Sequence, residues 1–157
     1  MVKFSDYLRL VKFSHTIFAM PFAMIGFTYA LKCGNHNLSE PWQWVVLLVQ
    51  VVLCMVFARN TAMGFNRWAD WRIDAENPRT ANREIPAGVI SPKKALWFVV
   101  VNAVLFITTA STINILTAVL SPVALAVVMF YSYCKRFTSL AHLVLGLSLG
   151  IAPVGAY

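Results

Sequence analysis

Asn66, Asp70 and Asp74 are the residues whose types and spacing point most directly to chemistry in this sequence. They recur at every fourth position, so on a helix their side chains lie along one face, each turned by about 40° from the last. Carboxylate and amide oxygens suit hard cations such as Mg2+, which also bridge to phosphate groups. The spacing therefore predicts a helix face that binds a divalent cation. The alternative is a solvated segment whose charges form ion pairs.

The segment around these residues is polar, whereas most of the sequence is apolar. Residues 66–88 read NRWADWRIDAENPRTANREIPAG and carry charges of both signs. Arginines beside carboxylates suit a site that holds a metal and a polyanion together. Its location between two apolar stretches favours this interpretation over a plain surface loop.

Arg59 interrupts the apolar stretch that precedes the polar segment. On a helix it lies two turns before Asn66, about 10 Å deeper in the membrane. Charged residues within membrane spans are rare and usually face a cavity. Arg59 is therefore a candidate anion contact in a cavity wall, and the alternative is an arginine that extends to the membrane surface.

The composition predicts an all-α, polytopic transmembrane helical bundle formed by a single domain over residues 1–157. Apolar residues make up 59% of the chain and charged residues 12%, and the mean hydropathy is +0.69. Soluble domains carry about 25% charged residues. Ser91 followed by Pro92 is typical of a helix start. Five spans of suitable length are expected after an interfacial helix over Met1–Ser14: Thr16–Leu31, Trp42–Phe65, Ala95–Ser111, Ile115–Tyr133 and Leu140–Tyr157.

The distribution of Lys and Arg predicts the orientation of these spans. The net charge is +7, and the cations gather before the first span, between the second and third, and at Lys135-Arg136. Loops rich in Lys and Arg stay on the cytoplasmic side. We therefore expect a multi-pass protein of the cytoplasmic (inner) membrane, with its N-terminus and the Asn66–Gly88 loop in the cytoplasm. The sequence has no basic patch interleaved with aromatic residues, so we expect no nucleic-acid partner.

The polar segment resembles a known motif. Asn66-x3-Asp70-x3-Asp74, continued as NPRTANREIPAG to Gly88, is similar to the first aspartate-rich motif of the UbiA-type intramembrane prenyltransferases. The similarity includes the lead-in over residues 58–65 and two later segments, residues 131–138 and 142–146. The variant looks most like the 4-hydroxybenzoate polyprenyltransferase branch. The resemblance covers nearly the whole chain, and a motif of this length is specific.

The resemblance implies a bundle of nine spans around a central cavity in the lipid bilayer. It implies Mg2+-dependent transfer of a polyprenyl group from polyprenyl diphosphate to an aromatic acceptor such as 4-hydroxybenzoate, in ubiquinone or menaquinone biosynthesis. Asn66, Asp70 and Asp74 are then the expected metal ligands, with Asp70 and Asp74 as catalytic residues. The expected substrate-binding residues are Arg59, Arg79, Arg83, Tyr131 and Lys135. Of these, Arg59 would contact the acceptor carboxylate.

The sequence departs from this family in one respect. The family has a second aspartate-rich motif in its later half, but no Asp follows Asp74 and no Glu follows Glu84. We therefore expect an N-terminal half with about five of nine spans, inactive or nearly so by itself. Other interpretations are a transporter fragment, a non-catalytic membrane scaffold, or a related enzyme with another acceptor, such as naphthoate, a haem or chlorophyll precursor, or a lipid glycerol.

Overall fold

The computed structural model describes residues 3–12, 20–33 and 40–137, and within these ranges all regular structure is helical. Three of the helices are long and apolar enough to cross a membrane: α3, α4 and α5. This confirms the predicted all-α membrane bundle. The helices are α1 (Phe4–Leu10), α2 (Met20–Cys33), α3 (Pro41–Glu76), α4 (Pro92–Ser111) and α5 (Ile115–Phe137).

Helix α3 is much longer than the span expected to end at Phe65. It continues unbroken for 36 residues to Glu76, so the first half of the expected Asn66–Gly88 loop is helical. The reason lies in the sequence, because neither Gly nor Pro occurs between Gly64 and Pro78. A residue before proline avoids the α conformation, and Asn77 is extended, with φ −96° and ψ 118°. The three motif residues therefore lie on one helix, as their spacing requires.

Helix α4 packs closely along α3. It begins with Ser91, whose Oγ accepts a hydrogen bond from the Lys94 amide, and with Pro92 at its first turn, as predicted. An added Cβ on Gly64 would lie 2.9 Å from a methyl group of Val99, so the helices cross where α3 has no side chain. Nearby, Asn60 donates a hydrogen bond from Nδ2 to Oδ1 of buried Asn102 at 3.0 Å. These contacts fix the position of α4 relative to the motif helix.

A short turn separates α4 from α5 at residues 112–114, between the spans expected at Ala95–Ser111 and Ile115–Tyr133. Thr117 donates from Oγ1 to the carbonyl of Ala110 at 2.7 Å, and Asn114 Oδ1 accepts from the Thr117 amide at 2.8 Å. Gln50 of α3 also donates to Thr112 Oγ1 at 2.9 Å. The turn is therefore attached to the start of α3.

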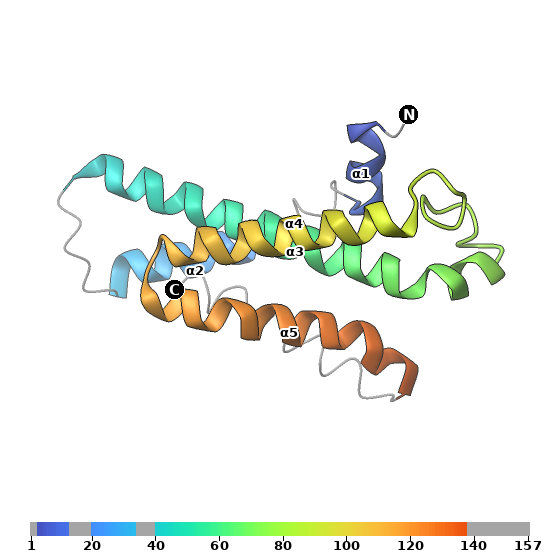
Figure 1. Cartoon of the computed structure of the whole chain (residues 1–157). Helices are drawn as coiled ribbons and strands as arrows, with labels where there is room; N and C mark the ends of the chain where they lie inside the picture. Colours follow the sequence, from blue (N-terminus) through green and yellow to red (C-terminus); the bar gives the residue numbers. More distant parts are fainter. Residues whose placement is uncertain (1–2, 13–19, 34–39, 138–157) are drawn as a thin grey trace.

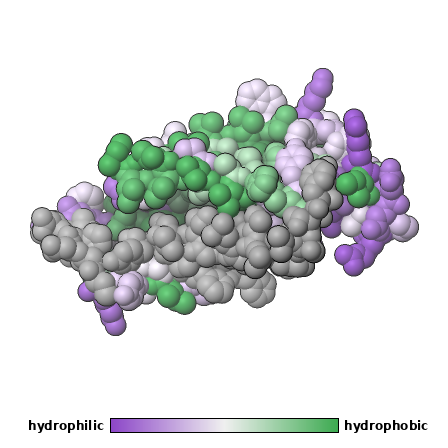
Figure 2. Space-filling model, turned by 90° about the horizontal axis from the view of Figure 1, so that it is seen from below, coloured by the Kyte–Doolittle hydropathy of each residue, from purple (hydrophilic) through white to green (hydrophobic). Residues whose placement is uncertain are grey.

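Alternating helix directions bring the polar segments to one end of the molecule. Figure 1 shows α4 running back along α3, and α5 running in the direction of α3 again. Helix α1, the loop after α3 and the C-terminal end of α5 consequently lie at the same end. Figure 2 shows apolar side chains over the middle of the molecule and most hydrophilic ones at this end. The side of the membrane that this end faces stays a prediction.

The first and last expected spans fall partly or wholly outside the described residues. Of Thr16–Leu31, residues 20–31 belong to α2, which packs on α3 through Ala23 and Phe27 against Val51. The expected span over Leu140–Tyr157, and the family segment at 142–146, lie outside the described residues.

Candidate active site

The motif residues occupy the last turns of α3. Asp70 and Asp74 are each only 7% exposed, and Asn66 is half-buried. An ordinary solvated helix face would leave such carboxylates in water, since Asp is almost never fully buried unless it is paired. Burial of two carboxylates at the end of an apolar helix favours a built site over a surface loop.

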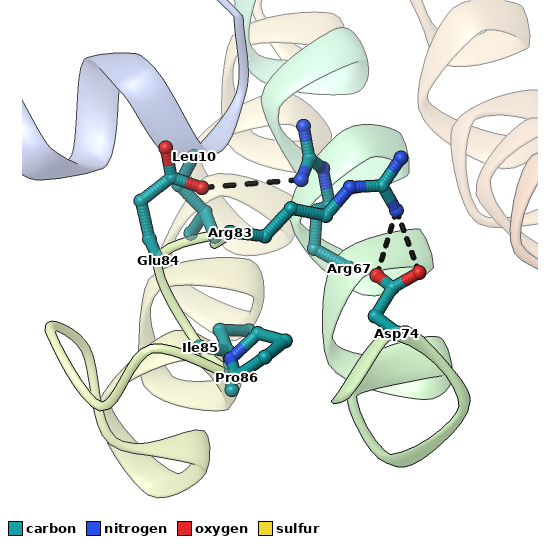
Figure 3. Close-up of a pocket in the computed structure, with 7 residues that line it drawn as sticks. All are labelled: Leu10, Arg67, Asp74, Arg83, Glu84, Ile85 and Pro86. Carbon is teal, nitrogen blue, oxygen red and sulfur yellow. Dashed lines mark hydrogen bonds and ion pairs between the residues drawn. The ribbon is translucent and has the colours of Figure 1, made fainter. Parts of the chain in front are cut away.

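The loop after α3 folds back onto Asp74. Nη1 of Arg83 donates to both carboxylate oxygens of Asp74, at 2.8 and 2.7 Å. Thr80 Oγ1 donates to the Asp74 carbonyl at 3.0 Å, and the Arg83 amide donates to the Thr80 carbonyl at 3.0 Å. Asp74 and Arg83, which are both expected in the site, are in direct contact (Figure 3).

A second ion pair lies beside the first and was not expected from the sequence. Nη1 of Arg67 faces Oε2 of Glu84 at 3.9 Å, and the side chains are only 7% and 19% exposed. Neither of these two atoms has a hydrogen-bond partner within the described part of the chain. The only signal in the sequence is spacing, since Arg67 precedes Asp74 by two helical turns and Glu84 follows Arg83 directly.

Both ion pairs line one small pocket, which α1 closes on one side. Leu10 of α1 is fully buried in it, and the lining residues are Leu10, Arg67, Asp74, Arg83, Glu84, Ile85 and Pro86. Leu10 packs with Ile85 and Ile90 of the loop. The rings of Tyr7 and Phe98 stack with their centroids 5.1 Å apart, and this contact attaches α1 to α4 as well. An apolar core thus holds the loop against the end of α3.

The donor chemistry of the motif fits a hard cation in part. Asn66, Asp70 and Asp74 offer oxygen ligands from one helix face, the type that Mg2+ requires. Within residues 3–12, 20–33 and 40–137, however, no three His, Cys, Asp or Glu side chains gather into a metal-binding cluster. A cation here would take its remaining ligands from water or from phosphate oxygens, as Mg2+ commonly does.

The other expected substrate contacts are spread around this end. Arg79 is exposed on the loop, and Tyr131 is half-buried in α5. Lys135 belongs to α5, but its side chain lies outside what the structure describes. The edge-on contact of Phe65 with Tyr133, at 5.8 Å between ring centroids, brings the end of α5 beside the motif helix. The segment around Tyr131 and the motif helix therefore lie side by side at this end.

Arg59 lies within the membrane-spanning part of α3. Its side chain is half-buried, and its Nε is buried with no hydrogen-bond partner among the described residues. A buried donor without a partner loses its hydration and gains nothing in return. This position suits an anion contact more than an arginine that extends to the membrane surface.

The sequence profile of the UbiA prenyltransferase family matches residues 17–157. The chain belongs to this family. Two relatives named 4-hydroxybenzoate octaprenyltransferase illustrate the similarity of this chain to other members of the family. The one from Aliivibrio fischeri (strain MJ11) is 40% identical over 114 residues. The one from Vibrio cholerae serotype O1 (strain M66-2) is 38% identical over 126 residues. Each alignment covers 73% of this chain, but only 39% of the Aliivibrio protein and 44% of the Vibrio protein.

Two solved structures share the fold of this chain over the matched part. The apo structure of a UbiA homologue from Aeropyrum pernix K1 superposes with a TM-score of 0.79 at 31% identity, over 91% of this chain and 49% of that one. A digeranylgeranylglyceryl phosphate synthase gives a TM-score of 0.84 over 99% of this chain and 53% of that one. At 18% identity, the second likeness concerns the fold alone. This chain thus spans about half the length of these structures.

Proposed function

We propose that this chain is the N-terminal half of an intramembrane enzyme that transfers a polyprenyl group from its diphosphate to an aromatic acceptor. One observation carries the proposal: Asp70 and Asp74 are buried at the end of an apolar helix, with Arg83 folded onto Asp74. The names of the relatives favour 4-hydroxybenzoate as acceptor. Such a reaction belongs to ubiquinone or menaquinone synthesis, and the positive segments favour a cytoplasmic orientation in the inner membrane.

Asn66, Asp70 and Asp74 are the proposed ligands of Mg2+. When bound, Mg2+ supplies positive charge that stabilises the departing diphosphate. Asp74 has a second role in the proposal, since its carboxylate already holds Arg83. A diphosphate carries more negative charge than one carboxylate, so Arg83 turns toward the diphosphate and Asp74 becomes available as a ligand. Arg79, Tyr131 and Lys135 are proposed as further contacts to this substrate.

The apolar helices serve the reaction by excluding water. Departure of the diphosphate leaves an allylic cation, which water would otherwise capture before the acceptor ring does. Arg59 lies about 10 Å from the motif along α3 and has a buried donor without a partner in the described residues. We propose that Arg59 binds the carboxylate of the acceptor. The aromatic ring of the acceptor would then lie between Arg59 and the diphosphate site.

The deciding experiment uses the full-length gene product in membranes. It measures transfer of a radiolabelled polyprenyl group to 4-hydroxybenzoate with Mg2+ and with EDTA. Product that depends on Mg2+ supports both the reaction and the acceptor. Turnover only with another aromatic acceptor keeps the reaction and changes the pathway. The absence of Mg2+-dependent turnover with any acceptor would refute the proposal.

A further inference from the structure

Arg67 is an unusual residue for the end of a membrane helix, because its guanidinium group is almost completely buried. Only 7% of the side chain is exposed, and the one ion pair of Arg67 in the described part of the chain joins it to Glu84 at 3.9 Å. A buried charge whose partner is removed is strongly destabilised. The Arg67–Glu84 pair therefore constrains where the loop lies on α3.

The constraint acts directly on Arg83, the residue before Glu84. Figure 3 shows the two neighbouring side chains leaving the loop, each meeting a partner from α3. Glu84 is attached to Arg67, and Arg83 reaches Asp74 two turns further along the helix. Two positive and two negative charges balance within one pocket. Removing one member of the Arg67–Glu84 pair would leave this pocket with a net charge.

We propose that Arg67 and Glu84 are positioning residues that hold Arg83 where it can bind the diphosphate. The inference rests on the proposed function and extends it to two residues that do not contact the substrate. When Arg83 leaves Asp74, the Arg67–Glu84 pair keeps the loop in place, so only the Arg83 side chain moves. Without the pair the loop backbone shifts, and Arg83 loses its alignment with the diphosphate oxygens.

The test compares Arg67→Gln, Glu84→Gln and the exchanged pair Arg67→Glu with Glu84→Arg in the full-length protein. We expect each single variant to raise KM for polyprenyl diphosphate by about tenfold, within the usual coupling of contacting residues, while KM for the acceptor stays constant. The exchanged pair restores part of this loss. Arg72→Gln is the matched control, because Arg72 is exposed on the same helix, and it should leave both KM values unchanged.

Glu84→Gln keeps the test decisive if Arg67→Gln does not fold, because Glu84 is the more exposed partner. An unchanged KM for polyprenyl diphosphate in Glu84→Gln, or equal losses with both substrates, would overturn the inference. Stabilisation by pyrophosphate, measured as the rise in Tm of purified protein, tests it without turnover. If the wild type transfers nothing, the proposed function fails. The positioning role still stands if pyrophosphate stabilises the wild type but not Glu84→Gln, and falls if the two behave alike or neither responds.

Discussion

At the residue scale, Asp74 combines two roles, because it is both a motif residue and the partner of Arg83. Asp70 and Asp74 are buried to the same degree, and Asp74 holds Arg83 with both carboxylate oxygens. A carboxylate that neutralises an arginine contributes to the folded structure as well as to any ligand site. Substitution of Asp74 should therefore affect stability as well as activity.

We expect Asp70→Asn and Asp74→Asn both to lower kcat by about 100-fold or more, the usual loss when one electrostatic group of an active site is removed. Asp74→Asn should also lower Tm, because it leaves Arg83 without its partner carboxylate. Transfer assays and thermal unfolding in detergent measure the two effects. An unchanged Tm in Asp74→Asn would contradict the structural role of the Asp74–Arg83 pair.

Arg59 offers a second prediction at this scale, which separates the two substrates. Replacing Arg59 by Gln should raise KM for 4-hydroxybenzoate by about 10- to 100-fold, as expected for hydrogen bonds to a charged group. KM for polyprenyl diphosphate should not change. An acceptor analogue without a carboxylate provides the control, because its KM should be the same for the wild type and for Arg59→Gln. If the variant affects both acceptors equally, Arg59 does not bind the carboxylate.

At the scale of elements, the crossing of α3 and α4 determines how the motif helix is held. The helices approach closely at Gly64 and share the amide pair Asn60–Asn102. Interhelical hydrogen bonds in membranes contribute on average only about 0.6 kcal/mol. The close approach at Gly64 is therefore the feature of this interface to test first.

Gly64→Ala tests this packing. Its new methyl group would meet Val99 Cγ2 at 2.9 Å, and overpacking of this kind typically costs about 1 to 3 kcal/mol. We expect a lower Tm that is partly restored when Val99→Ala is added, since the second change removes the clashing group. Additive losses in the double variant would show that Gly64 is required for another reason.

At the scale of the whole molecule, three positively charged segments lie at one end, and the turn between α4 and α5 lies at the other. With native cysteines replaced by alanine, we expect Ser5→Cys and Asn82→Cys to react with an impermeant maleimide only when it has access to the cytoplasmic side. Ser111→Cys should react only from the opposite side. Labelling of all three from one side would contradict the arrangement, and labelling with the sides exchanged would contradict the orientation.

Much of this architecture could be predicted because local rules determine it. The cap at Ser91, the turn before Ile115 and the four-residue spacing from Asn66 each depend on neighbours in sequence. The length of α3 was underestimated, because the change from apolar to polar residues after Phe65 does not interrupt the helix. The Arg67–Glu84 pair could not be predicted, since it depends on how the loop folds back. Which residues bind metal and substrate stays a prediction.

For the proposed reaction, the length of α3 has a consequence for how the lipid substrate is supplied. Its 36 residues extend about 54 Å, whereas the hydrocarbon core of a bilayer is about 30 Å thick. A helix of this length extends beyond the hydrocarbon core, and the motif occupies its last three turns. This suits contact with the diphosphate of a membrane-dissolved isoprenoid, which resides outside the core. Such a substrate arrives by lateral diffusion in two dimensions. Turnover should accordingly follow its mole fraction in the bilayer, and adding inert lipid at constant total substrate should slow the enzyme.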